Sequence, residues 1–264
     1  EASMLDTFFL ESDPFVFLIV LLPLTLVALA LGYGLTIRYG KPQDGHAETA
    51  FGLGQRAIFG LIALILAFSF SFAAQRFQAR HDLVVNEAEA ISTTYLRADF
   101  LPAAQRSRFR RSLIAYDKTR LETYADVSNA LAEGRATDRG TALQTQLWAI
   151  ASGAARGDPR NPFYNALTSS MNETIDVSEQ QAAALDNHIP SAIIGLVLFS
   201  IIAGAALLGV TLGRAKSPDV ILAIFFCLLF NATVFTIVDL DHPQGGFIHV
   251  DVAPLQATLD EMKP

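Results

Sequence analysis

The sequence has little cysteine and little charge. Its 264 residues include one cysteine, Cys227, so neither an intrachain disulfide nor a site with several thiolate ligands can form. Charged residues make up 17% of the chain and hydrophobic residues 52%, whereas a soluble domain has about 25% and about 45–50%. These figures exclude a secreted disulfide scaffold, a disordered chain and a soluble α/β enzyme.

Charge is absent from four long hydrophobic runs. Residues 15–37, 57–75, 191–212 and 220–238 contain no Asp, Glu, Lys or Arg. Each run is long enough to cross a hydrocarbon core of about 30 Å as a helix. No basic residue precedes the first run, so we expect a retained span rather than a signal peptide. The sequence therefore predicts an all-α membrane protein with four transmembrane helices.

The segment between the second and third runs has an ordinary soluble composition. Residues 76–188 contain 13 Lys or Arg and 14 Asp or Glu. Because no proline lies between Ala57 and Phe100, one helix is expected to continue out of the membrane. Further helices are expected near 103–133 (ended by Gly134), 138–155 and 163–188.

Apolar residues of this segment recur at helical spacing, which predicts an extramembrane helical bundle inserted between the second and third spans. Glu87 falls near one such seam, where an unpaired carboxylate is costly, so Arg97 or Arg120 is expected to pair with it. The seam comprises Val84, Ala88, Ile91, Tyr95 and Ala98, and the next helix presents Phe109, Leu113 and Tyr116. The predicted parts are an N-terminal tail (1–14), transmembrane helices 1 and 2 (15–75), the extramembrane helical domain (76–188), transmembrane helices 3 and 4 (189–239) and a C-terminal tail (240–264).

Basic residues near the ends of the spans indicate which side of the membrane each loop occupies. Cytoplasmic loops carry an excess of Lys and Arg. The two short loops carry five such residues and the other side carries two, which favours cytoplasmic short loops and an external large domain. The five are Arg38, Lys41, Arg56, Arg214 and Lys216; the two are Arg76 and Arg80.

A stripe of regularly spaced residues runs along the second span and continues just beyond its end. Leu64, Phe68, Phe72, Arg76 and Arg80 are separated by steps of four, so they lie on one slowly spiralling face of a helix. In a symmetric oligomer, facing stripes would form a hydrophobic pore constriction with anion-attracting arginines at its mouth. Alternatively, the phenylalanines pack against neighbouring spans, and the arginines lie at headgroups or in salt bridges.

Two carboxylates, Asp239 and Asp241, end the fourth span. Close carboxylates next to a glycine turn could bind a cation such as Ca²⁺, although the spacing does not fit an EF-hand loop. The competing interpretation is a helix-ending turn in which the acids pair with Arg76 or Arg80. Apart from this Ca²⁺ possibility, the sequence predicts no cofactor.

No catalytic or nucleic-acid motif accompanies these residues. A nucleophile elbow, a P-loop, a zinc signature and a nucleotide fingerprint are all lacking, so we expect no enzyme and no metal centre. Basic clusters with interleaved aromatics are also lacking, which disfavours nucleic acid as a partner. Inside the spans, Asn231 and the small residues Gly195, Gly204 and Gly209 favour helix–helix contacts.

Three stretches, in the same order along the chain, resemble those of a known family. They are FSFSFAAQRFQARHDLVVNEAEAISTTYLRADFLP at 68–102, LWAIA at 147–151 and DLDHPQGGFIHVDVAPL at 239–255. Together they resemble a family of four-span bacterial membrane proteins of unknown function described as bestrophin-like. That family usually has Arg after the second Asp of the DLD motif, where this chain has His242.

The resemblance implies a multi-pass protein of the bacterial inner membrane. Its label implies kinship with bestrophins, which are pentameric anion channels with a cytoplasmic domain and a pore narrowed by hydrophobic rings of the second span. Leu64, Phe68 and Phe72 are similar in spacing to that constriction. The implied cytoplasmic domain opposes the charge count, so the side of the membrane stays open here.

Two functional hypotheses follow. The first is a homo-oligomeric channel, for inorganic anions, in the lipid bilayer, with the second span lining the pore. The second is a non-conducting membrane scaffold or sensor whose helical domain binds a partner, in which case Arg76 and Arg80 would be buried against acids such as Asp239.

Overall fold

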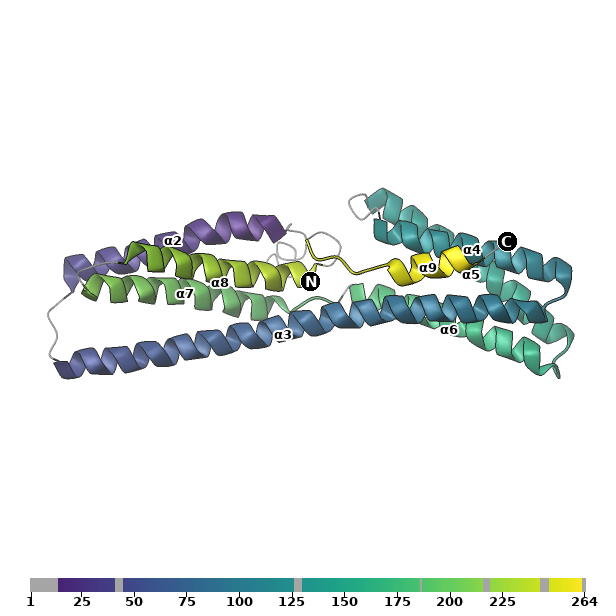
Figure 1. The fold of residues 1–264 in the computed structure, drawn as a ribbon, viewed down its shortest axis with the longest axis horizontal. Coiled ribbons are helices and arrows are strands. Elements are labelled where there is room, and N and C mark those ends of the chain that lie inside the picture. Colours follow the sequence, from purple (N-terminus) through teal and green to yellow (C-terminus); the bar gives the residue numbers. More distant parts are fainter. Residues whose placement is uncertain are drawn as a thin grey trace. The chain divides into compact units, whose positions relative to one another are not determined.

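The computed structural model describes residues 14–40, 45–125, 130–185, 187–215, 219–242 and 247–262, with the backbone alone at 14–17, 125 and 130–133. All regular elements in these ranges are helical, as the sequence predicts (Figure 1). The long helices are α2 (Pro14–Tyr39), α3 (Gly45–Arg97), α4 (Ala103–Ala125), α5 (Ala130–Gly157), α6 (Pro162–Leu185), α7 (Ser191–Ala215) and α8 (Val220–Asp241). The short ones are the 3₁₀ turn η1 (Ala98–Phe100) and α9 (Ala253–Glu261).

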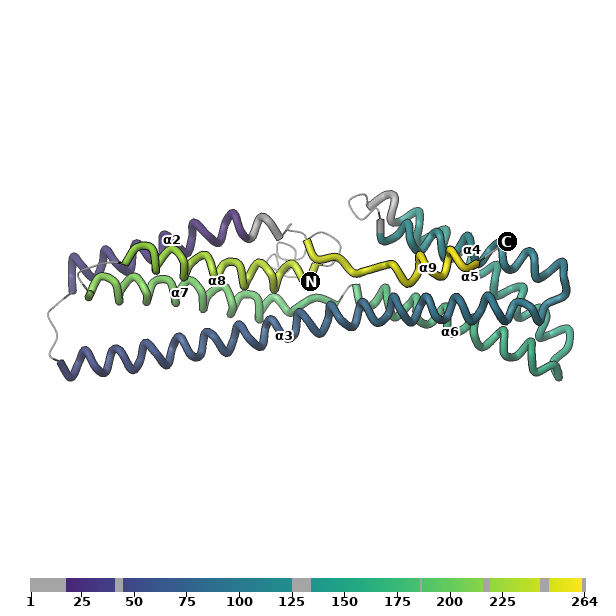
Figure 2. The backbone as a smooth tube through the Cα atoms, viewed as in Figure 1, coloured from purple at the N-terminus to yellow at the C-terminus, as the bar shows by residue number. Residues whose placement is uncertain are grey.

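Four helices are long and apolar enough to cross a membrane: α2, α3, α7 and α8. They correspond to the four predicted runs. The chain forms two compact units, unit 1 with residues 1–76 and 188–248 and unit 2 with residues 77–187 and 249–264. The helix α3 contributes to both units and runs without interruption, as the tube in Figure 2 shows.

Close packing of α2 against α7 holds unit 1 together. A β-carbon built on Gly209 of α7 would collide with the carbonyl oxygen of Leu29 in α2, and one built on Gly32 of α2 would collide with the carbonyl oxygen of Ala206. Glycine therefore lets the two backbones touch, as small residues do in membrane helix pairs. The prediction for Gly204 and Gly209 is confirmed, whereas a β-carbon on Gly195 would meet nothing within 4 Å.

A polar contact joins α8 to α2 inside unit 1. Asn231 is 1% exposed, and its Nδ2 donates hydrogen bonds to Thr25 Oγ1 at 3.0 Å and to the Cys227 carbonyl at 2.8 Å. Thr25 in turn donates to the Leu22 carbonyl of its own helix. Asn231 thus connects two apolar helices through hydrogen bonds where lipid offers none.

We expect Asn231→Ala to lower stability by about 0.6–1.7 kcal/mol, the range found for interhelical hydrogen bonds in membranes. Thermal unfolding of the detergent-solubilised protein measures this loss. Thr233→Ala is the matched control on the same helix, because Thr233 is half-buried and its hydroxyl donates to the carbonyl of Leu229 within that helix. An equal effect of the two substitutions would contradict the interhelical role.

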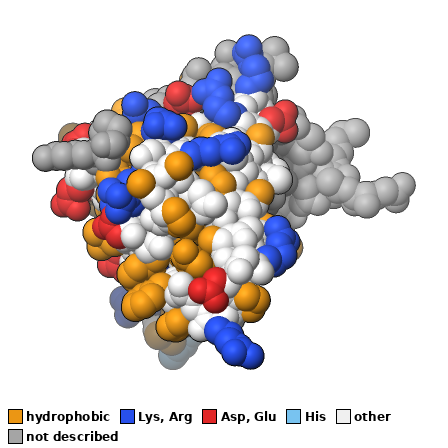
Figure 3. Space-filling model, turned by 90° about the vertical axis from the view of Figure 1, so that its right-hand side faces the viewer, with side chains coloured by type: hydrophobic (Ala, Val, Ile, Leu, Met, Phe, Trp, Pro, Cys, Tyr) orange, Lys and Arg blue, Asp and Glu red, His pale blue; other side chains and the backbone are white. Residues whose placement is uncertain are grey.

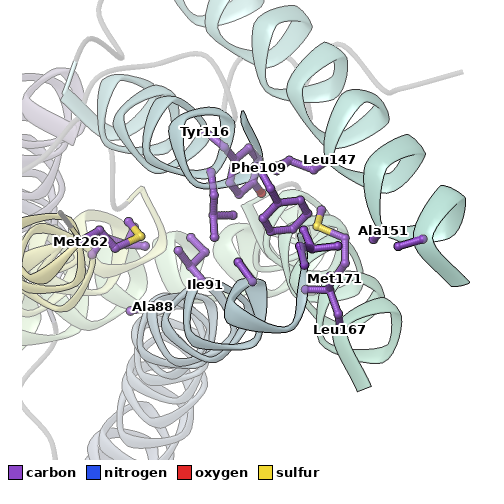
Figure 4. Close-up of a cluster of buried hydrophobic side chains, with 14 of the residues drawn as sticks. Ala88, Ile91, Phe109, Tyr116, Leu147, Ala151, Leu167, Met171 and Met262 are labelled. Atoms are coloured by element: carbon purple, nitrogen blue, oxygen red, sulfur yellow. The ribbon is translucent and has the colours of Figure 1, made fainter. Parts of the chain in front are cut away.

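Unit 2 has one hydrophobic core built from α3, α4, α5, α6 and α9. Phe109, Leu147, Leu167 and Met171 are fully buried there and point toward one another (Figure 4). The predicted seam residues Val84, Ala88, Ile91 and Ala98 are also buried, with Tyr95 packed at the edge of the core. Helical periodicity in the sequence therefore identified the core face of α3 and α4 correctly.

One buried ion pair lies in unit 2. Arg120 of α4 donates from Nε to Glu87 Oε1 of α3 at 2.6 Å and from Nη2 to Glu87 Oε2 at 3.3 Å. Glu87 is fully buried, and the Arg120 side chain is 15% exposed. The expectation that Arg97 or Arg120 pairs with Glu87 is confirmed for Arg120, whereas Arg97 donates to the carbonyl of Ala166.

Some boundaries differ from the prediction. The helix α3 begins at Gly45, twelve residues before the second hydrophobic run. In this first part of the helix, the Phe51 ring has the guanidinium carbon of Arg214 3.7 Å from its centroid. Gly134 lies inside α5 and ends no helix. A glycine in a helix interior costs only about 1 kcal/mol, which the packing of α5 against α4 outweighs.

The C-terminal segment, predicted as a tail, contains a helix. Residues 253–261 form α9, which packs against α4, and Leu255 is fully buried in the core of unit 2. A nine-residue helix is too short to be stable by itself, so its burial in the core stabilises it.

Candidate functional site

The candidate site is the face of α3 that carries Leu64, Phe68 and Phe72. These side chains are 50%, 56% and 45% exposed in the single chain. The buried residues of the same stretch are Ile62, Leu66, Ser69 and Ala73. Since each residue advances by about 100°, Leu64 and Phe68 lie about 200° from Ile62 and Leu66, on the opposite side of the helix.

The buried side of α3 packs against α7 and α8 within unit 1. A β-carbon on Gly204 of α7 would lie 3.1 Å from Cδ1 of Ile62, which shows how closely the two helices approach. Phe59 meets Phe226 of α8 edge to face, with ring centroids 5.5 Å apart. These contacts fix the rotation of α3, and they leave the stripe of Leu64, Phe68 and Phe72 directed away from the rest of unit 1.

Arg80 serves a local structural purpose. It is 2% exposed, and its Nε and Nη2 donate to the carbonyl oxygens of Ala184 and Asn187, each at 3.0 Å. The last carbonyls of a helix have no partner within the helix, and a cation is favourable at that end. Arg80 therefore caps the C-terminal end of α6, and Arg76, one turn earlier on α3, is partly buried.

Asp239 and Asp241 hold backbone segments of unit 1 in place. Asp239 is 1% exposed and accepts hydrogen bonds from the amides of Phe247 at 2.8 Å and Ile248 at 3.0 Å. Asp241, also 1% exposed, accepts from the amide of Ile189 at 3.0 and 3.1 Å. Asp239 thus binds the backbone of the segment that follows α8, and Asp241 binds the backbone of the segment that precedes α7.

Two histidines adjoin this pair. His188 Nδ1 lies 3.4 Å from Asp241 Oδ2, and the rings of His188 and His242 stack with centroids 5.3 Å apart. His242 Nδ1 lies 2.9 Å from the Val238 carbonyl. Sequence reasoning missed His188, because 53 residues separate it from Asp241 and no motif connects them. Within the described ranges, no group of three or more His, Cys, Asp or Glu side chains could hold a metal ion.

Comparison with known proteins identifies the fold. A bacterial bestrophin homologue from Klebsiella pneumoniae superposes with a TM-score of 0.63 at 17% identity, covering 94% of this chain and 95% of that one. A single-substitution variant of that homologue gives 0.64 at 19% identity with the same coverage. None of the curated proteins compared with the chain matches it.

The family comparison covers nearly the whole chain. The bestrophin-like domain matches residues 22–255, a range that contains the stripe on α3, both carboxylates that end α8 and all of α4 to α7. The apolar helices α3, α7 and α8, the part of α2 from residue 22 on, and the two quoted end stretches fall within the same range. The chain therefore belongs to the bestrophin-like domain family.

Proposed function

We propose that the protein is a homo-oligomeric anion channel in which α3 lines the pore. The observation that carries this proposal is the exposed stripe of Leu64, Phe68 and Phe72 on a helix whose opposite side is buried. In a cyclic oligomer with α3 around the axis, each stripe residue would form a ring. Rings of leucine and phenylalanine form a constriction that can gate by dewetting.

The basic residues that follow on α3 support anions as the permeant species. Arg76 and Arg80 come one and two turns after Phe72. Hydrogen bonds from Arg80 to carbonyl oxygens leave its positive charge in place, because carbonyls are neutral. Rings of such charges raise the local concentration of anions. Membership of the bestrophin-like family supports the same proposal, including a pentamer as the assembly.

The proposed arrangement places unit 2 outside the membrane, as a bundle inserted between the second and third spans. The segment 76–188 has 13 basic and 14 acidic residues, a composition that suits water and not lipid. Figure 3 shows a face on which basic, acidic and hydrophobic side chains are interspersed. This balance gives the segment 76–188 no simple polyelectrolyte role.

The channel needs no cofactor in this proposal. The carboxylate oxygens of Asp239 and Asp241 already accept hydrogen bonds from Phe247, Ile248 and Ile189. These bonds use part of the lone pairs that a Ca²⁺ ion, which takes about six to eight oxygen ligands, would need. The positions of both carboxylates favour a structural role at the end of α8.

One observation favours the alternative, a non-conducting scaffold or sensor. Arg80 is buried, as that hypothesis expects of the arginines. At the end of α6 its Nε and Nη2 donate to two backbone carbonyls. The two functions differ in what the exposed stripe does: it lines a water-filled axis in the channel and faces lipid or a partner in the scaffold.

Anion flux into vesicles tests the channel directly. We expect the reconstituted protein to conduct anions, and we expect Phe68→Ala and Phe72→Ala to raise the flux, because a wider and less apolar constriction holds water more readily. Ile221→Ala is the matched control, since Ile221 is 83% exposed on α8. A monomer in solution, an absence of flux, or flux unchanged by both phenylalanine substitutions would overturn the proposal.

We place unit 2 on the cytoplasmic side, as family membership implies, against the count of basic residues at the span ends. The only cysteine, Cys227, is buried in α8, so a cysteine introduced at exposed Glu89 would be the sole accessible thiol. In intact cells we expect Glu89→Cys to resist a membrane-impermeant thiol reagent and to react after lysis. Labelling before lysis would place unit 2 outside.

A further inference from the structure

The interior of unit 2 contains a polar cluster that the proposed channel does not use. Arg120 pairs with Glu87 and also donates from Nη2 to Gln181 Oε1 of α6. The Tyr116 hydroxyl donates to Glu87 Oε1 at 3.3 Å and accepts from Gln144 of α5 at 3.1 Å. We refer to Glu87, Tyr116, Arg120 and Gln181, together with Asp117, as the buried cluster.

Asp117 is the acidic member of the buried cluster whose hydrogen bonds are unmet; the Nε2 of Gln181 is the other cluster atom without a partner among the described residues. It lies on α4 next to Tyr116 and is fully buried. Among the residues that the structure describes, neither of its carboxylate oxygens has a hydrogen-bond partner. Glu87, in contrast, accepts two hydrogen bonds from Arg120 and one from Tyr116. Arg120 therefore gives hydrogen bonds to Glu87, and the carboxyl group of Asp117 receives none of them.

An ionised carboxylate without partners is costly in a protein interior, and the usual response is to bind a proton. We propose that Asp117 is a proton-binding site of unit 2, because its buried carboxyl group without hydrogen-bond partners holds a proton in the folded protein. A proton removes the net negative charge of the buried cluster. The surrounding helices then pack around a neutral side chain.

The electrostatic surroundings agree with this assignment. Burial, followed by the charge of Glu87, raises the pKa of Asp117 to about 7, and Arg120 opposes the rise. Burial also raises the pKa of Tyr116 to about 12 and that of Tyr124 further, so both phenols stay neutral. The described acidic and basic side chains of α5, α6 and α9 are exposed: Arg135, Asp138, Arg139, Arg156, Glu173, Asp176, Glu179, Asp260 and Glu261.

The sign of the pH effect follows from this shift. The pKa of Asp117 is raised from 3.8 to about 7 on folding, so between these values the folded protein holds a proton that the unfolded chain releases. The stabilisation is complete below pH 3.8 and is lost as the pH rises through about 7. Stability attributable to Asp117 must therefore fall on going from acid to neutral pH.

Asp117→Asn tests the proposal, because asparagine keeps the shape of the neutral acid but cannot ionise. We compare unfolding of the full-length protein in detergent at about pH 5 and about pH 8. Relative to Asp117→Asn, the folded-to-unfolded ratio of the unaltered protein should fall by on the order of tenfold to a hundredfold over this range. Asp138→Asn, at an exposed position of α5, should leave the pH dependence unchanged.

A second measurement detects the proton on the unaltered protein directly. Infrared difference spectra of the unaltered protein, recorded during a pH titration, should show the carbonyl band of a buried carboxylic acid that disappears near neutral pH, and Asp117→Asn should lack it. Parallel pH profiles of the two proteins, or the absence of such a band in the unaltered protein, would overturn the proposal.

Discussion

Replacing Arg120 by methionine is expected to lower the free energy of unfolding by about 3–5 kcal/mol, because the change leaves Glu87 buried without its partner. Glu87 is fully buried and takes two hydrogen bonds from Arg120, the shorter at 2.6 Å. Methionine keeps much of the apolar stem of the arginine, so the loss reports chiefly on the charge and its hydrogen bonds. Denaturant unfolding of the detergent-solubilised protein, followed by circular dichroism, measures it.

Arg139→Met is the matched control for this substitution. Arg139 pairs with Glu122 at 3.1 Å, and both side chains are more than half exposed. An exposed pair contributes about 0–1 kcal/mol, so a much smaller loss is expected. Equal losses for Arg120→Met and Arg139→Met would show that burial of Glu87 does not govern the stability of unit 2.

Substituting alanine for Gly209 is expected to disrupt unit 1. The new β-carbon would overlap the carbonyl oxygen of Leu29 and also lie 2.8 Å from the amide nitrogen of Tyr33, so α2 must move away from α7. Overpacking of this kind usually costs about 1–3 kcal/mol, and here the obstacle is backbone, which cannot rotate aside. We expect a lower melting temperature and a smaller folded fraction in size-exclusion chromatography.

Gly195→Ala provides the comparison on the same helix. A β-carbon at Gly195 meets nothing within 4 Å, and alanine is favoured over glycine in a helix by about 1 kcal/mol. This substitution should therefore be neutral or stabilising. If Gly209→Ala behaves in the same way, then α2 and α7 do not approach through their backbones as described.

Local patterns were enough to predict much of the fold. The four charge-free runs became four apolar helices, and the spacing of Val84, Ala88 and Ile91 identified the core face of α3. The helix break near 134 was placed wrongly, because Gly134 was taken as a helix end although α5 continues through it. The folding of α9 onto unit 2 was also missed, since a short amphipathic segment gives no signal of which surface covers it.

The partners of the charged residues could be predicted only where few choices existed. Arg120 was one of two expected partners of Glu87, and the structure selects it. For Asp239 and Asp241 the sequence predicts a cation or an arginine, and the structure adds a kind of partner outside that prediction, the amides of Phe247, Ile248 and Ile189. Every residue carries an amide, so no sequence pattern distinguishes the ones that a carboxylate will meet.

The scarcity of charge and its confinement to a few segments were sufficient to determine a helical protein with four apolar spans, because the cost of burying charge in lipid depends on composition and run length alone. Tertiary structure decided which side of each helix is covered. The contacts of Ile62 and Phe59 with α7 and α8 leave Leu64, Phe68 and Phe72 exposed. Packing likewise leaves Asp117 buried without a hydrogen-bond partner among the described residues, because burial depends on contacts between helices distant in the sequence.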